Sequence, residues 1–203
     1  MKIIDISLPI KPRMMVYPGN PEVVFEPANS PTSELTKLSF GSHTGTHIDA
    51  PRHSKVSDAG IDSYELETFI GACRVIDATH ESESISLKTI TNNEIHSGER
   101  LLFKTQNSVI GFNAWRDDYI YLSGEAAEEL ARLDIKLFGL DWISVKQRGN
   151  PDNRAHTELL SKNIPILEGL DLSKVEPGEY ELIFLPLSLA DLDGALGRAI
   201  LRK

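Results

Sequence analysis

Residues 43–53 constrain this chain more than any other stretch, because they concentrate ligand-type side chains in backbone that cannot form a regular helix. The segment reads His-Thr-Gly-Thr-His-Ile-Asp-Ala-Pro-Arg-His and holds three of the six histidines of the chain, together with Asp49. Its threonines and isoleucine are β-branched, Gly45 is a weak helix former, and Pro51 would break any helix that reached it. We therefore expect extended chain here.

In extended chain, His47 and Asp49 share a face at a separation of roughly 6–7 Å, close enough to flank one ion. Ideal strand would carry His43 about 13 Å from His47, too far to share a metal with bonds of about 2.0–2.2 Å. The chain must therefore bend, and Gly45 permits a bend. Pro51 then ends the strand and returns His53 to the same site. Imidazole and carboxylate ligands without a nearby cysteine favour a catalytic metal site, with zinc or a first-row neighbour.

The length of 203 residues and the mass of 22.5 kDa fit a single domain over residues 1–203. No apolar run approaches the roughly 20 residues that cross a bilayer, and the first residues do not open a signal peptide, so we expect a cytoplasmic protein. The single cysteine, Cys73, agrees with a reducing compartment. A formal net charge of −9 argues against nucleic acid or an anionic membrane as partner.

Hydrophobic periodicity and turn residues predict more strands than helices, without the regular alternation of a doubly wound sheet. Strands are expected at residues 2–10, 23–25, 36–42, 74–77, 101–105, 137–141, 165–167, 180–185 and 195–201. Helices are expected at residues 64–69, 125–133 and 153–163. Ser123 is the expected N-cap of the second helix, which has acidic residues in its first turns.

The pattern H-x-G-T-H-x-D-A-P-x-H resembles the signature of the cyclase family of metal-dependent hydrolases, whose best characterised branch is the bacterial kynurenine formamidases (arylformamidases). The similarity continues through residues 155–160, 166–170, 175–183, 185–187 and 198–201, and so covers effectively the whole chain. It implies a mixed α/β fold, the swivelling β/β/α domain, with a central mixed β-sheet and peripheral helices. It also implies a homodimer or higher homo-oligomer, in which an N-terminal loop reaches a neighbour's active site.

The resemblance further implies the roles of six side chains. Five of them would hold two divalent ions. His43, His47 and Asp49 would bind the first ion. Asp49 would also bridge to a second ion, whose site His156 and Glu168 complete. His53 would be the catalytic proton shuttle and not a ligand. We expect zinc from this ligand set, and manganese fits the oxygen-richer second site nearly as well.

The reaction implied is hydrolysis of a small amide or formamide, such as N-formylkynurenine to kynurenine and formate in tryptophan catabolism. Two departures leave the substrate open. Tyr17 stands where kynurenine formamidases usually carry a substrate-contacting Trp, and residues 142–149 replace their Pro-Ser-Leu type loop. Tyr17 is either a substrate-binding residue or a surface aromatic. The alternatives are a cyclic-amide (isatin-type) hydrolase, a cyclase or dehydratase using the same residues, and a non-enzymatic metal-binding protein.

Other residues offer weaker signals. Asp141, at a strand end, either contacts substrate, orients a metal ligand or caps the loop backbone. His80 and His96 have no ligand-type partner at suitable spacing and are expected at the surface. The chain contains neither G-x-S-x-G nor H-E-x-x-H, which disfavours a serine hydrolase and a zincin.

Overall fold

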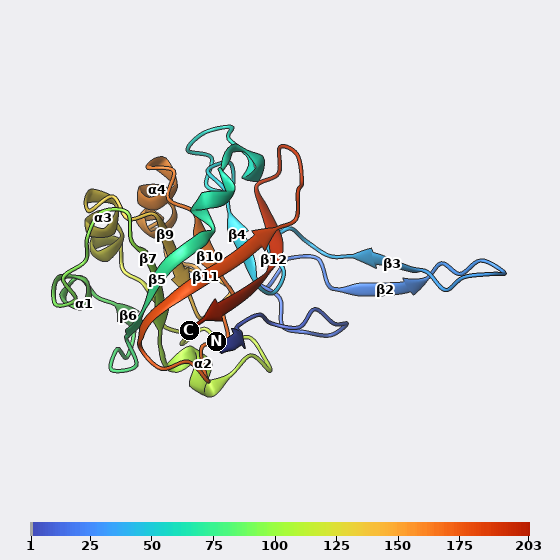
Figure 1. Cartoon of the computed structure of the whole chain (residues 1–203), viewed down its shortest axis with the longest axis horizontal. Coiled ribbons are helices and arrows are strands. Elements are labelled where there is room, and N and C mark those ends of the chain that lie inside the picture. The colour runs from blue at the N-terminus through green and yellow to red at the C-terminus, as the bar shows by residue number, and fades with distance from the viewer. Residues whose placement is uncertain (1) are drawn as a thin grey trace.

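The fold is built on a mixed sheet of eight strands that closes on itself (Figure 1). The computed structural model describes residues 2–203. The strand order is β1-β12-β11-β5-β7-β9-β10-β4, and β4 pairs back with β12. The strands are β1 Ile3–Asp5, β4 His47–Asp49, β5 Ile70–Asp77, β7 Arg100–Lys104, β9 Leu137–Leu140, β10 Ile166–Glu168, β11 Gly178–Pro186 and β12 Gly194–Arg202. This mixed, barrel-like sheet confirms the predicted fold class.

Parallel pairing joins β5, β7, β9 and β10, and antiparallel pairing joins the remaining neighbours. Strand β4 lies between two antiparallel partners, because His47 is opposite Glu168 of β10 and opposite Leu196 of β12. The segment that carries the histidine motif is therefore held on both sides by the sheet.

Side-chain alternation divides the core into two clusters, one on each face of the sheet. The inner cluster fills the closed sheet and draws residues from the strands around it, among them Ile48, Leu102 and Leu167. The outer cluster includes Phe103 and Phe138 and packs against the helices. Those helices are α3 Gly124–Arg132 and α4 Arg154–Ser161, which lie together on one side of the sheet (Figure 1).

Several predicted elements are confirmed. The Oγ of Ser123 accepts a hydrogen bond from the Ala126 N–H and caps α3, and α4 lies within the predicted 153–163 helix. The prediction of a strand over residues 2–10 is wrong beyond β1, because the chain then leaves the sheet and the Leu8 N–H donates to Thr46 Oγ1 at 2.8 Å. Residues 64–69 form only a 3₁₀ turn at Leu66–Thr68.

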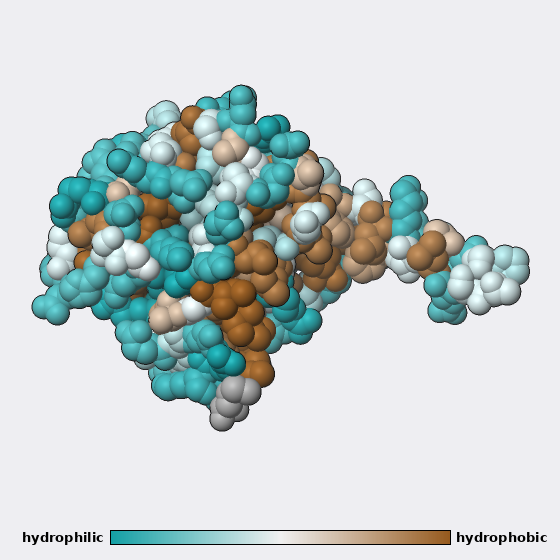
Figure 2. All heavy atoms as spheres, turned by 45° about the horizontal axis from the view of Figure 1, so that its top comes forward, coloured by the Kyte–Doolittle hydropathy of each residue, from teal (hydrophilic) through white to brown (hydrophobic). Residues whose placement is uncertain are grey.

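The strands predicted at residues 23–25 and 36–42 form an antiparallel hairpin outside the main sheet, β2 Val24–Pro27 with β3 Thr36–Ser39. The hairpin projects from the body as an arm (Figure 1) and carries exposed apolar side chains (Figure 2), including Phe25 and Leu38. The remaining elements are short and were not predicted: α1 Leu87–Thr91, α2 Gln106–Ile110, β6 Ser84–Ile85, β8 Tyr121–Leu122 and a 3₁₀ turn at Ile61–Ser63. Among the described residues, no helix is long and apolar enough to cross a membrane.

Candidate active site

The bend predicted at Gly45 is present and brings His43 to Asp49, which three imidazoles surround. Gly45 has a φ of +62°, in the left-handed region that suits glycine. Asp49 Oδ1 lies 2.8 Å from His43 Nδ1 and 3.4 Å from His47 Nε2, and Asp49 Oδ2 lies 3.8 Å from His156 Nε2. The Asp49 side chain is 1% exposed. Burial opposes its ionisation, but the charges of His53 and His43 hold the pKa of Asp49 well below its usual value.

His47 is oriented by backbone. Its Nδ1 lies 2.9 Å from the Gly45 carbonyl oxygen, which can only accept, so Nδ1 carries the proton. Its Nε2 therefore faces Asp49 and also Glu168 Oε2, at 3.3 Å. The other Glu168 oxygen accepts from the Val145 N–H at 2.5 Å. Burial alone would lower the pKa of His47, but the nearby carboxylates of Asp49 and Glu168 raise it to about 10 in the metal-free protein.

His43 lies between two carboxylates, of which the sequence indicated only one. Its Nε2 is 2.9 Å from Asp193 Oδ2, and the other Asp193 oxygen accepts from Ser42 Oγ at 2.9 Å. Burial opposes the charge, but Asp49 and Asp193 raise the pKa of His43 to about 9. The hydrogen bond from His43 in turn lowers the pKa of Asp193.

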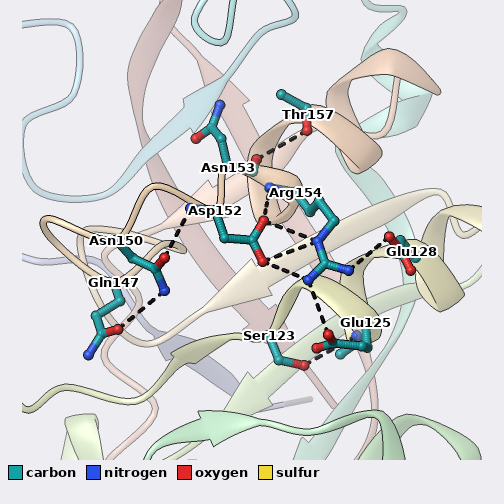
Figure 3. A network of polar contacts seen from close by, with 10 residues as sticks. Ser123, Glu125, Glu128, Gln147, Asn150, Asp152, Asn153, Arg154 and Thr157 are labelled. Carbon is teal, nitrogen blue, oxygen red and sulfur yellow. Dashed lines mark hydrogen bonds and ion pairs between the residues drawn. The ribbon is translucent and has the colours of Figure 1, made fainter.

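His156 reaches the site from the first turn of α4. Its Nδ1 lies 3.3 Å from Asn153 Oδ1, which directs Nε2 toward Asp49. Burial lowers the pKa of His156, which favours the neutral ligand form. Arg154 ties this turn to α3 by ion pairs to Glu125 at 3.1 Å and to Glu128 at 2.9 Å, and it also pairs with Asp152, just before α4, at 2.7 Å (Figure 3).

His53 lies at the edge of the cluster, after Pro51 has ended the strand. Its ring centroid is 4.0 Å from that of His43 and 5.3 Å from that of His156. Its Nδ1 is 3.9 Å from Asp193 Oδ2, and its side chain is 32% exposed. It is thus accessible to a bound molecule, while His47 and Asp49 are 1% exposed.

The donor set fits divalent metal. His47 Nε2 and Asp49 Oδ2 are buried and have no hydrogen-bond partner, an arrangement that costs free energy unless a ligand binds them. Two groups of three residues have potential ligand atoms within 4.8 Å of one another. One group is His43, Asp49 and His53, and the other is His47, Asp49 and Glu168. These groups differ from the ligand sets implied by resemblance, which place His43 with His47 and leave His53 free.

A cavity of about 410 Å³ opens over these groups. Its lining residues are Tyr17, Asn20, His43, His53, Ser54, Ile143, Ser144, Lys146, Gln147, Asn153, His156, Glu168 and Asp193. Tyr17 is half-buried here, and its ring packs edge-on against Trp115 with centroids 5.0 Å apart. The position of Tyr17 is therefore that of a pocket wall.

Asp141 belongs to the scaffold. Its side chain is fully buried and accepts from the N–H and Oγ1 of Thr105, at 2.8 and 2.7 Å, and from the Ser108 N–H at 3.1 Å. This is the backbone-capping alternative. His80 and His96 are exposed, as predicted.

Comparison with known proteins agrees with this geometry. Residues 4–147 match the family model "Putative cyclase". The chain is 37% identical over its whole length to a kynurenine formamidase of Salinibacter ruber, covering 98% of that protein. A kynurenine formamidase of Bacillus mycoides is 36% identical over 98% of this chain and 96% of its own.

Solved structures extend the similarity to the fold. A structure titled as a predicted metal-dependent hydrolase of Bacillus stearothermophilus is 31% identical, with a TM-score of 0.88 over 98% of this chain and 97% of its own. Isatin hydrolase A of Labrenzia aggregata shares the fold at 21% identity, with a TM-score of 0.82 over 98% of this chain and 93% of its own. The sequence motif, the closed mixed sheet and these matches together place the chain in the cyclase family.

Proposed function

We propose that this protein is a metal-dependent hydrolase that cleaves a small amide or formamide bond, with an arylformamidase-like conversion of N-formylkynurenine to kynurenine and formate as its reaction. The observation that carries the proposal is the pair of unpartnered buried donors, His47 Nε2 and Asp49 Oδ2, beneath a cavity that has His53 at its edge. The full-length similarity to kynurenine formamidases supports the substrate class.

The ligand roles follow the family pattern: His43, His47 and Asp49 for one ion, and Asp49, His156 and Glu168 for a second. Divalent ions held there supply positive charge that polarises a carbonyl group and acidifies water. Zinc suits the imidazole-rich set, and manganese is the alternative.

The protein residues control protons and orientation. His53 donates a proton to the leaving nitrogen, because it borders the cavity and imidazole is the side chain that most often serves as a general acid. Tyr17 offers its ring to an aryl group, and its packing on Trp115 keeps that ring in place.

The test is hydrolysis by zinc- and manganese-loaded protein of N-formylkynurenine, formanilide and the cyclic amide isatin. A kcat/KM of roughly 10⁴ M⁻¹s⁻¹ or more on N-formylkynurenine supports the proposal. The His53→Ala variant should keep its metals and lose at least about a hundredfold in rate. Turnover of isatin alone would assign the pocket to cyclic amides, and no turnover of any substrate by the metal-loaded protein would refute the proposal.

We further propose that residues 1–203 act as one cytoplasmic domain that forms a homodimer or higher homo-oligomer. The projecting β2–β3 hairpin supports association, since Phe25 and Leu38 are 38% and 55% exposed. The lone, buried Cys73 suits a reducing compartment. Sedimentation of the intact protein tests the oligomeric state.

A further inference from the structure

The cavity above the proposed metal site has an uneven distribution of charge. Its carboxylates, Glu168 and Asp193, lie beside the histidine cluster. Apart from the histidines, Lys146 is the one cationic side chain among the residues that line it. The 142–149 loop therefore contributes a cationic residue, separate from the histidines, to the lining of the cavity.

The Lys146 ammonium has no carboxylate within ion-pair distance among the described residues, whereas the neighbouring cations of this region are paired. Arg148 lies 3.5 Å from Asp117, and Arg154 pairs with three carboxylates. In a chain with a formal net charge of −9, a half-buried lysine without an acidic partner is a group available to bind an anion.

The backbone that carries Lys146 is held by several hydrogen bonds. The Lys146 carbonyl accepts from Ser144 Oγ at 2.8 Å and from the Tyr119 hydroxyl. The adjacent Val145 N–H donates to Glu168 at 2.5 Å, which links this segment to a proposed metal ligand. A rigid backbone holds the Cα of Lys146 at a constant position relative to the reacting centre. This preorganisation reduces the conformational entropy lost when a ligand binds.

We propose that Lys146 binds a carboxylate of the substrate, so that this site selects amides whose molecule also carries a carboxylate. A single ammonium, in a lining that also holds the neutral residues Gln147 and Asn20, suits a monoanion better than a phosphate, which would need more positive charge. This inference rests on the proposed amide hydrolysis and names its substrate class.

The experiment compares formanilide with 2-, 3- and 4-formamidobenzoate, which differ from it only by a ring carboxylate, on the metal-loaded wild type, Lys146→Gln and Lys146→Arg. Lys146→Gln should lower the ratio of kcat/KM for the best formamidobenzoate over formanilide by about 10- to 100-fold, mostly through KM. Lys146→Arg, which keeps the charge, should restore part of the preference. Arg148→Gln is the matched control, because it removes a loop charge outside the cavity lining and should leave the ratio unchanged.

An unchanged ratio in Lys146→Gln, or an equal fall in Arg148→Gln, would overturn the inference. If the wild type hydrolyses none of the four compounds, turnover of N-formylkynurenine and isatin decides the proposed function, and calorimetric binding of the same formamidobenzoates decides the role of Lys146. Weaker binding by Lys146→Gln than by wild type supports the anion site, and equal binding refutes it.

Discussion

Loading the site with metal should release two protons per protein molecule at pH 6.5, although three histidines are proposed as ligands. Metal binds neutral imidazole. In the metal-free protein the pKa of His43 is raised to about 9 and that of His47 to about 10, so both are cationic at this pH. Burial lowers the pKa of His156, so this ring is already largely neutral. Zinc-bound water, with a pKa of about 7, stays mostly un-ionised under these conditions.

Proton release can be counted by calorimetric zinc titration in buffers of different ionisation enthalpy. His43→Asn should release one proton and His156→Asn should still release two, although both variants bind metal more weakly. Near pH 6.5 the logarithm of the apparent affinity should rise by about two units per pH unit, because two protons compete with the metal. Release of three protons, or of none, would refute the charge states assigned to these rings.

The same raised pKa values predict that the metal-free protein loses stability as pH rises from 6.5 through 9 and 10, since its histidine–carboxylate pairs lose their charge; melting temperatures across this range test it. Asp49→Ala should abolish binding of both ions because it removes the shared ligand, and two ions found by metal analysis would contradict the bridging role. In Gly169→Ala the new Cβ would lie 2.2 Å from the Gly45 carbonyl, so metal affinity should fall more than in Gly98→Ala, which has a similar positive φ but open space. Arg154→Met should lower the melting temperature. The difference in melting temperature from the wild type should shrink in 1 M NaCl, where the screening length is about 3 Å.

The bend at Gly45 could be predicted because geometry left no alternative: straight strand would separate His43 from His47 by about 13 Å. The place of Asp193 in the site could not be predicted, because it stands 150 residues from His43 in the sequence. It reaches the site only because β12 begins at the next residue and pairs with β4, a long-range register that no local pattern encodes. The five-residue helices α1 and α2 are too short to show a helical period.

Asp141 illustrates a different limit. A carboxylate at the end of a strand can face a substrate or bond to the next loop, and the local sequence is the same in both cases. The choice depends on where Thr105 and Ser108 lie, and these residues come from a neighbouring strand end and from α2. Sequence therefore identified the residue as structurally important but left its role open.

Core packing and the proposed metal site depend on the same register of β4. Ile48 is fully buried in the inner cluster, opposite Leu167 and Ala195 of the same cluster. Because alternate strand residues face opposite sides, burying Ile48 turns His47 and Asp49 toward the cavity side. A slip of one residue would place both polar side chains in the apolar interior and the isoleucine at the site, losing core packing and leaving a buried charge unpaired. The hydrophobic residue between the ligands thus acts as a determinant of ligand geometry, although it contacts neither metal nor substrate in the proposed mechanism.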